Sequence, residues 1–329
     1  MTHSKVFNNK RVVITGGLGF IGSTLAKRLV EYNANVTLLD SMNTGCGGNY
    51  HNIREIENDV EVITGDICNP DITGTITGDL DYLFNLAAQT SHMGSLTDPF
   101  GDMNANVNSQ LMILERLRHL NSKARVVYTS TRQVYGKSTR LPVKEDHPRN
   151  PVDINGVNKL AGESYHILYN KLHGIDVTVL RLTNTYGPRM RIKDAYQNFL
   201  GGWIGNVVRG MPIEVWGGTQ LRDYNFVADV INALILAAAS EDTSGKVFNL
   251  GGTEPVNLFQ LTETLTAIDS NITVVKREFP EERKSVDLGD FYSDATFIRN
   301  NLGWEPETDL KTGLTRTLEY FRENQEYYL

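Results

Sequence analysis

The sequence predicts an α/β fold: a doubly wound, mainly parallel sheet followed by a smaller C-terminal α/β lobe. Over the first 180 or so residues, short β-branched runs alternate with longer amphipathic segments, which is typical of a parallel sheet covered on both faces. The runs Val12–Ile14 and Val36–Leu39 are almost continuously apolar, as expected of strands buried on both sides. After about residue 185, glycine and proline pairs divide the chain into shorter elements.

The spacing of apolar residues and the residue types define the helices and strands expected in the first lobe. The expected strands are Arg11–Thr15, Asn35–Asp40, Val60–Gly65, Tyr82–Ala87, Arg125–Ser130 and Asp176–Leu180. The expected helices are Ile21–Glu31, Met103–His119 and Lys159–Lys171. We expect residues 1–185 to form the first lobe and residues 186–329 the second. A helical pattern at Val230–Ala239 and a strand pattern at Val247–Asn249 predict that roughly residues 226–252 return to the first lobe.

Composition excludes several classes of protein. The chain has 329 residues, 40% of them hydrophobic, and a net charge of −7, which argues against a nucleic-acid-binding surface. The first residues, Met1–Lys5, lack the apolar core of a signal peptide, and no apolar run reaches the roughly 18 residues that span a membrane. Cys46 and Cys68 lie far apart, and the seven histidines form no ligand cluster. We therefore expect a cytoplasmic protein without a metal site.

A glycine-rich turn is the strongest local signal. Gly16, Gly19 and Gly22 have GxxGxxG spacing directly after a predicted strand and before a predicted helix. The first glycine permits a tight turn, the second lets the backbone approach a pyrophosphate, and the third lets the helix pack closely. The helix N-terminus, with Phe20 and Ile21, then faces the anion. This context predicts a Rossmann-type dinucleotide-binding fold.

Asp40 indicates which dinucleotide binds. It ends the second predicted strand about 20 residues past the glycines, where a carboxylate accepts hydrogen bonds from a ribose diol and repels a 2′-phosphate. The predicted cofactor is therefore NAD and not NADP. Asp66 and Ile67 follow the third strand at the same edge of the sheet, where they could contact the adenine.

Further segments resemble one enzyme family through nearly the whole chain. They are Asn85–Gln89, Asn104–Val107, Ser130–Gly136, Arg181–Arg189, Gln220–Tyr224 and Leu302–Pro306. With the glycine turn, they resemble the extended short-chain dehydrogenases/reductases, and within these the NAD-dependent nucleotide-sugar epimerases and dehydratases. The resemblance implies that NAD takes a hydride from the sugar, usually from C4, and often returns it.

The resemblance also implies roles for individual residues. Leu86, Ala87 and Ala88 would lie beneath the nicotinamide, and Thr131 and Lys159 would serve catalysis. A nucleotide-diphosphate sugar would be bound by Arg132, Gln133, Asn184, Arg222 and Arg283, with Lys284 beside the last of these. Such enzymes usually dimerise through two helices, here Met103–His119 and Lys159–Lys171, so a homodimer is expected.

One position departs from the family pattern. The family places a Tyr-x-x-x-Lys pair in the helix after the fifth strand, where the lysine lowers the pKa of the tyrosine that takes the sugar hydroxyl proton. Lys159 is present, but Asn155 occupies the tyrosine position, and an amide is not a base at neutral pH. The alternatives are His92, Asp153, and a relay from Lys159 through water and Asn155.

The residues after Thr131 favour one reaction. The 4,6-dehydratases of the family carry Asp-Glu there, and the related decarboxylases carry a glutamate at the second position. Arg132 and Gln133 supply neither group. We therefore expect epimerisation, most simply at C4 through a transient 4-keto sugar. The alternatives are a dehydratase or decarboxylase with unusual acid–base residues, and a catalytically weak protein that binds NAD and a nucleotide sugar. Arg132 could also recognise an acidic sugar such as a uronic acid.

Overall fold

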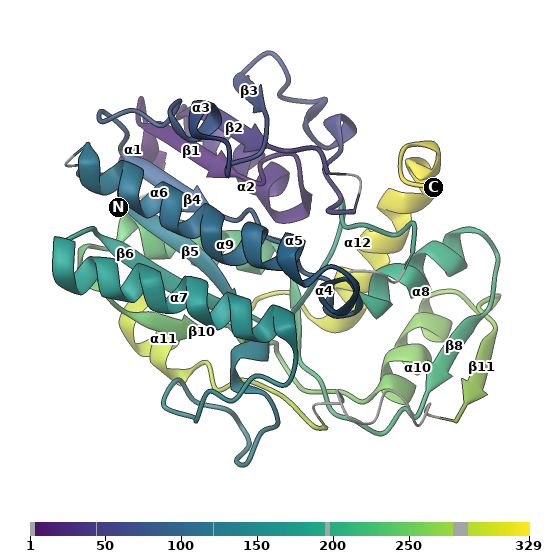
Figure 1. Ribbon diagram of the computed structural model, residues 1–329. Helices are drawn as coiled ribbons and strands as arrows, with labels where there is room; N and C mark the ends of the chain where they lie inside the picture. The colour runs from purple at the N-terminus through teal and green to yellow at the C-terminus, as the bar shows by residue number, and fades with distance from the viewer. Residues whose placement is uncertain (1–3, 44, 121, 195–197, 279–288) are drawn as a thin grey trace.

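A seven-stranded parallel sheet forms the centre of the computed structural model, which describes all residues except 1–3, 44, 121, 195–197 and 279–288 (Figure 1). The strands lie in the spatial order β10 (Val247–Asn249), β6 (Val177–Leu182), β5 (Arg125–Thr131), β4 (Tyr82–Asn85), β1 (Arg11–Thr15), β2 (Asn35–Asp40) and β3 (Val60–Thr64). Every neighbouring pair is parallel, so the carboxyl ends of the strands meet at one edge.

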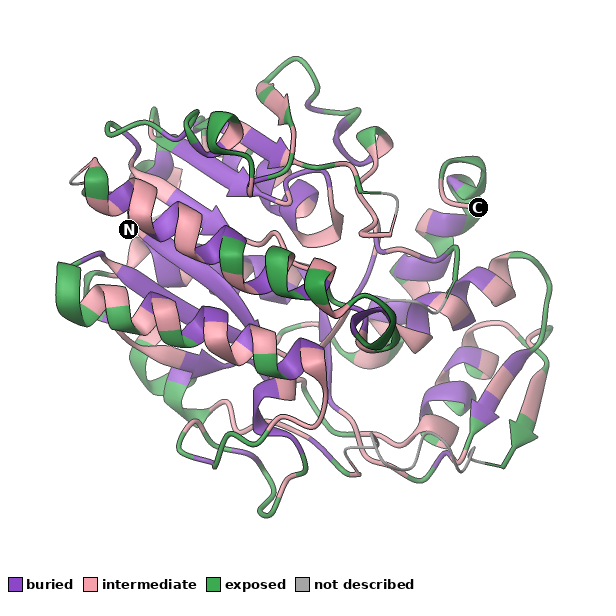
Figure 2. Cartoon of the chain, viewed as in Figure 1, coloured by how far each residue is buried: buried purple, intermediate pink, exposed green. Residues whose placement is uncertain are grey.

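Helices cover both faces of this sheet. One face packs against α1 (Ser4–Phe7), α2 (Phe20–Glu31), α9 (Val227–Ala239) and α11 (Thr296–Leu302). The other packs against α3 (Pro70–Thr73), α6 (Ser109–His119) and α7 (Ile154–His173), with α6 and α7 side by side (Figure 1). Apart from the edge strand β3, the strands are largely buried between these layers, while exposed residues lie on the outward faces of the helices (Figure 2). The predicted doubly wound fold is confirmed.

A second core, built mainly from the C-terminal part of the chain, lies beside the carboxyl edge of the sheet. Its elements are β7 (Asn184–Tyr186), α8 (Phe199–Val208), β8 (Ile213–Trp216), β9 (Tyr224–Phe226), α10 (Leu258–Ile268), β11 (Val274–Arg277) and α12 (Leu310–Glu323). Two small parallel sheets, β8–β11 and β7–β9, stabilise it. Strand β10 pairs with β6, so the chain returns to the large sheet before it completes this second core.

Short helices connect the larger elements and deliver several site residues. They are η1 (Tyr50–Ile53), α4 (His92–Thr97), α5 (Pro99–Met103), the π-helical η2 (Asn104–Asn108), η3 (Arg132–Tyr135), η4 (Glu241–Thr243) and η6 (Gln325–Tyr327). The short helices η1 and η6 also meet: the His51 and Tyr327 rings stack with centroids 3.7 Å apart. The C-terminus is thereby held against the first lobe.

The main differences between the predicted helix boundaries and the structure concern the segment around Met103 and the start of α7. The segment predicted as one helix from Met103 begins earlier, at Pro99, and changes from α to π geometry at Asn104 before it continues as α6. Helix α7 begins at Ile154, because Asp153 caps it by accepting a hydrogen bond from the Gly156 N–H at 2.6 Å. Asn155 therefore lies in the first turn of α7. The described residues contain no helix long and apolar enough to cross a membrane.

Candidate active site

The glycine turn joins β1 to α2 and has the shape that a dinucleotide requires. Gly16 has a φ of +70°, which favours glycine. A Cβ on Gly19 would lie 3.2 Å from the Gly16 carbonyl oxygen, and a Cβ on Gly22 would overlap that oxygen. Side chains at these positions would therefore fill the cradle before the N-terminus of α2. The turn fits the pyrophosphate of a dinucleotide.

Asp40 contacts the glycine turn at the end of β2. Its Oδ2 accepts a hydrogen bond from the Leu18 N–H at 3.0 Å, and its Oδ1 accepts one from the Met42 N–H at 2.9 Å. Each carboxylate oxygen has a second lone pair with which to accept a ribose hydroxyl. Asp40 can therefore hold the turn and receive the ribose at once. Asp66, after β3, caps the next turn through the Cys68 N–H, and Ile67 lies in the core.

The backbone after β4 is tied to β1 through one hydroxyl. Thr15 Oγ1 accepts hydrogen bonds from the N–H groups of Leu86 and Ala87, both at 3.0 Å, and donates to Asn85 Oδ1 at 2.8 Å. Asn85 in turn donates to Gln110 Oε1 at 2.6 Å, inside the sheet–helix interface. The segment that carries Ala88 therefore leaves the sheet in a fixed direction beside the glycine turn.

Lys159 lies in the interior at the junction of α7 and β5. Its Nζ donates to the Thr129 carbonyl oxygen at 2.7 Å and lies 4.6 Å from the centre of the Tyr128 ring. Burial lowers the pKa of Lys159 to about 8, although the carboxylates of Glu163 and Asp102 act in the opposite direction. Thr131, which ends β5, caps η3 by accepting the Gln133 N–H at 3.3 Å and keeps its own hydroxyl proton to donate.

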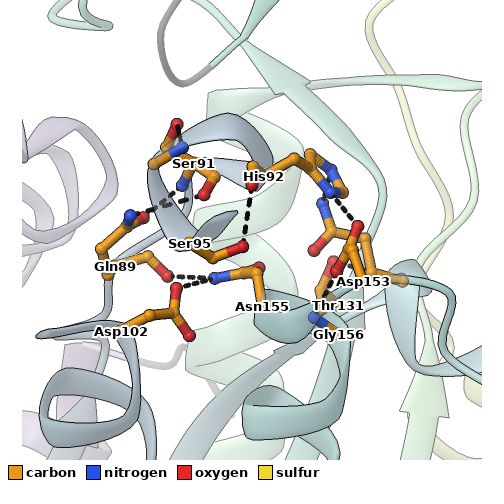
Figure 3. Close-up of polar contacts among 11 residues, drawn as sticks. Gln89, Ser91, His92, Ser95, Asp102, Thr131, Asp153, Asn155 and Gly156 are labelled. Carbon is orange, nitrogen blue, oxygen red and sulfur yellow. Dashed lines mark hydrogen bonds and ion pairs between the residues drawn. The ribbon is translucent and has the colours of Figure 1, made fainter. Parts of the chain in front are cut away.

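Asn155 has a fixed amide orientation. Its Nδ2 donates to the Gln89 carbonyl oxygen and to Asp102 Oδ2, both at 2.8 Å (Figure 3). Both partners can only accept, so the nitrogen must face them and Oδ1 must face away. Asp102 Oδ1 accepts hydrogen bonds from the side-chain amides of Asn106 and Asn158, at 3.1 and 2.8 Å. The buried Asp102 carboxylate is thus held by three side-chain amides, and Asn155 presents an oxygen that does not titrate.

His92 and Asp153 form a pair at the same end of α7. His92 Nδ1 is hydrogen-bonded to Asp153 Oδ2, and His92 begins α4 (Figure 3). Because a carboxylate faces Nδ1, this nitrogen carries the proton and Nε2 is the acceptor. Nε2 contacts the side-chain amide of Gln133. Burial raises the pKa of Asp153. The hydrogen bond and the electrostatic interaction with His92 lower it by more, so the pKa of Asp153 lies below its usual value.

The predicted substrate-binding residues come from both lobes. Arg132 lies over the Phe291 ring at 5.3 Å, and Asn184 Nδ2 donates to the Asp223 carbonyl oxygen at 2.9 Å. Arg222 donates to the backbone oxygens of Leu221 and Gly289. Electrostatic interactions connect Arg132 with Arg222 and Asp223, so η3 and the segment before β9 face one another. Arg283 and Lys284 lie outside the described residues.

Sequence reasoning missed two members of this site. Asp102 was not singled out, although its carboxylate fixes the amide of Asn155. Asp223 was quoted only as part of a motif, but it is buried and its Oδ1 has no partner among the described residues. Neither has a local signal, because each acquires its partners from segments distant in the chain. No group of three or more potential metal-ligating side chains occurs within the described ranges.

The profile of the NAD dependent epimerase/dehydratase family matches residues 12–251, and the chain belongs to this family. It is an NAD-dependent enzyme of the nucleotide-sugar epimerase/dehydratase type, as the sequence resemblance predicted. A UDP-glucose 4-epimerase from Mycolicibacterium smegmatis is 33% identical over 321 residues, which cover 96% of this chain and 100% of that protein.

Solved structures agree in fold. An epimerase from Methanothermobacter thermautotrophicus superimposes with a TM-score of 0.91 at 27% identity, covering 99% of this chain and 96% of the other. A UDP-glucuronic acid 4-epimerase from Bacillus cereus, in complex with UDP-glucuronic acid and NAD, superimposes with a TM-score of 0.84 at 27% identity. That match covers 95% of this chain and 99% of the other.

Proposed function

We propose that this protein is an NAD-dependent nucleotide-sugar 4-epimerase that acts through a transient 4-keto sugar. Bound NAD would supply the hydride acceptor, and then the hydride donor, for C4 of the sugar. Arg132 and Gln133 follow Thr131 and provide no carboxylate with which to expel water from the sugar. Similarity to 4-epimerases that act on UDP-glucose and on UDP-glucuronic acid supports the same reaction.

The observation that carries the proposal is the His92–Asp153 pair. We propose that His92 Nε2 accepts the proton of the sugar hydroxyl. Asp153 holds the proton on Nδ1, which leaves Nε2 with a free lone pair once the sugar hydroxyl replaces the Gln133 amide there. The imidazolium that forms is then stabilised by the adjacent carboxylate. Asn155 cannot take the proton, but its outward-facing Oδ1 can accept a hydrogen bond and position the sugar.

The remaining site residues bind and orient the reactants in this proposal. Lys159 and Asp40 hold the two ribose groups of NAD, and Gly16, Gly19 and Gly22 receive its pyrophosphate. Thr131 donates to the sugar oxygen at C4, and Arg222 donates to the diphosphate of the substrate. We place Asn184 and Arg283 in the same substrate site.

Product analysis tests the reaction. The NAD-loaded protein is incubated with UDP-glucose, UDP-glucuronic acid or UDP-N-acetylglucosamine carrying deuterium at C4, and the products are identified by NMR. We expect the C4 epimer with deuterium retained at C4, because the same hydride leaves and returns. Loss of water or of carbon dioxide would instead identify a dehydratase or a decarboxylase, and an unchanged sugar in every case would contradict the enzymatic function.

His92→Gln tests the proton acceptor. We expect kcat to fall about 10²- to 10⁴-fold, the usual contribution of a general base, with KM little changed. His119→Gln is the matched control, since His119 is an exposed residue at the end of α6, and its kcat should equal that of the wild type. A normal kcat in His92→Gln would rule out His92 as the acceptor and leave Asp153 and the relay from Lys159 as the candidates.

We also propose a homodimer that works in the cytoplasm. Several large apolar side chains are exposed along α5 and α7, next to or within the segments 103–119 and 159–171 through which the family usually dimerises. They are Phe100 (74%), Met103 (37%), Val157 (52%), Leu168 (45%) and Leu172 (66%). A second copy of the chain would cover them. Cys46 and Cys68 are both free, which suits a reducing compartment.

A further inference from the structure

Four shielded polar atoms beside the end of β5 have no hydrogen-bond partner among the described residues. They are Arg132 Nη1, Gln133 Oε1, Asp223 Oδ1 and Tyr224 Oη. The first two belong to η3 and the last two to the segment that enters β9, and Arg132 interacts electrostatically with both Asp223 and Tyr224. Buried polar atoms in native proteins are almost always paired. A cluster of unpaired atoms from two lobes therefore indicates a place for a polar ligand.

Arg132 is held in position without a carboxylate partner. Its guanidinium lies 5.3 Å from the centre of the buried Phe291 ring, and Phe291 is tied to the facing segment by its N–H, which donates to the Leu221 carbonyl oxygen at 3.0 Å. No ion pair joins Arg132 to an acidic side chain in the part of the chain that the structure describes. The guanidinium is thus pre-oriented, and its charge is not neutralised by direct contact.

The two nearby carboxylates have other partners. Asp153 is paired with His92, and Asp223 Oδ2 accepts the Ser293 N–H at 2.9 Å. Burial, and after it the charge of Arg222, lower the pKa of Arg132 to about 10, although Asp223, Tyr224 and Asp153 act in the opposite direction. Among the described residues, no acidic side chain therefore forms a direct ion pair with this guanidinium, and a ligand carboxylate could form one.

We propose that Arg132 binds a carboxylate on the sugar ring, so that the substrate is a nucleotide-linked hexuronic acid. This inference rests on the proposed epimerase function and names its substrate class. A carboxylate matches the planar guanidinium through two parallel hydrogen bonds. The ring hydroxyls can pair with Gln133 Oε1, Asp223 Oδ1 and Tyr224 Oη. A neutral hexose would supply the same hydroxyls but would leave the guanidinium without a directly paired carboxylate.

Binding measurements test this substrate class without requiring turnover. UDP-glucuronic acid, UDP-glucose and UDP are titrated calorimetrically into the NAD-loaded full-length protein. We expect the acid to bind at least about tenfold more tightly than UDP-glucose, as a charge-assisted bidentate pair provides. Arg132→Met should weaken binding of the acid by about the same factor and leave UDP-glucose and UDP within about twofold.

Two further variants serve as controls. Arg140→Met removes an exposed arginine from the same lobe and should preserve the preference for the acid. Arg132→Lys keeps the charge but loses the two parallel hydrogen bonds, so it should retain only part of the preference. The NAD content and melting temperature of each variant show whether it is folded.

The inference is overturned if wild-type protein binds UDP-glucose as tightly as the acid. It is also overturned if Arg132→Met weakens all three ligands equally. Failure of the proposed function looks different: the preference for the acid and its loss in Arg132→Met persist, but NMR detects no epimerised product. Conversely, epimerisation of neutral sugars without a preference for the acid supports the function and contradicts the inference.

Discussion

The side chain of Asn155, at the position where the family carries its tyrosine, is committed to neighbours in the fold. Its amide nitrogen donates to Gln89 and Asp102, and the Asp102 carboxylate also depends on Asn106 and Asn158. Asn155 is therefore part of a buried network that ties α7 to α5 and η2. A base must come from elsewhere, and the His92–Asp153 pair lies at the same end of α7.

Titration of Asp223 should make the free energy of unfolding depend on pH, and substitution of this residue can measure its contribution. Burial raises the pKa of Asp223 to about 6, whereas in the unfolded chain it is about 3.9. Between roughly pH 4 and pH 6, the folded state therefore binds a proton that the unfolded state has lost. The contribution of Asp223 to the free energy of unfolding is thus most favourable below pH 4 and declines as the pH rises to 6.

Asp223→Asn should remove this contribution while keeping the acceptor for the Ser293 N–H. Denaturant unfolding at several pH values compares the variant with the wild type. We expect the variant to gain stability relative to the wild type as the pH rises from 4 to 6. Asp59→Asn, at an exposed aspartate, is the control and should show no such relative gain. A constant difference between Asp223→Asn and wild type would contradict the pKa assignment.

Helix α7 is the element that organises the site. Asn155, Lys159 and Glu163 follow at intervals of four residues and so lie on one face, which is turned toward β5 and the end of α5. Asp153 precedes them as the cap of the helix. The position of α7 relative to the sheet therefore determines where the Lys159 ammonium and the Asn155 amide lie.

A buried ion pair between α7 and β6 holds this helix in place. Arg181 donates to both carboxylate oxygens of Glu163, at 3.0 and 2.5 Å, and Ser130 donates to Glu163 at 2.6 Å. Glu163→Gln leaves the Arg181 guanidinium buried without a counterion, so we expect a loss of about 3–5 kcal/mol in the free energy of unfolding. Denaturant titration measures this loss.

A matched control is available in the exposed pair Glu214–Arg277, which joins β8 to β11. Glu214→Gln should change the free energy of unfolding by no more than about 1 kcal/mol, because water screens this pair. Equal effects of Glu163→Gln and Glu214→Gln would show that the buried pair does not fix α7.

At the scale of the whole molecule, the parallel sheet brings functional residues from distant segments of the chain together at one edge. The glycine turn, Asp40 and Thr131 all follow carboxyl ends of strands, as binding sites of open α/β sheets do. The second lobe adds Arg222, Asp223 and Tyr224 beside η3. The groups that we assign to the cofactor and to the substrate thus meet where the two lobes adjoin.

The proposed dimer makes a prediction at this scale. Leu168→Glu combined with Leu172→Glu places two charges on the exposed apolar face of α7. Sedimentation velocity should show a dimer for the wild type and a monomer for the double variant, because charges are poorly tolerated in the core of such an interface. Met211→Glu, at a half-exposed methionine of the second lobe, should remain dimeric. A monomeric wild type, or an unchanged double variant, would contradict the dimer.

The sequence predicted the sheet well because its signals are local. Alternation of strands and helices, the three glycines and Asp40 each occupy a few neighbouring residues whose period or spacing is characteristic. The conversion to π geometry at Asn104 and the start of α7 at Ile154 were not predicted, since local propensity places element boundaries only approximately.

By itself, the sequence determined the doubly wound fold, the NAD-binding turn and the absence of the usual tyrosine at Asn155. Only the tertiary structure shows which side chains surround Asn155, because the relevant contacts join residues far apart in the chain. Asp102 meets Asn155 across 53 positions, and His92 meets Asp153 across 61. That Arg132 Nη1 has no hydrogen-bond partner among the described residues is likewise a property of packing between lobes. Such pairings depend on how the helices pack on the sheet, and the spacing of neighbouring residues in the sequence does not predict them.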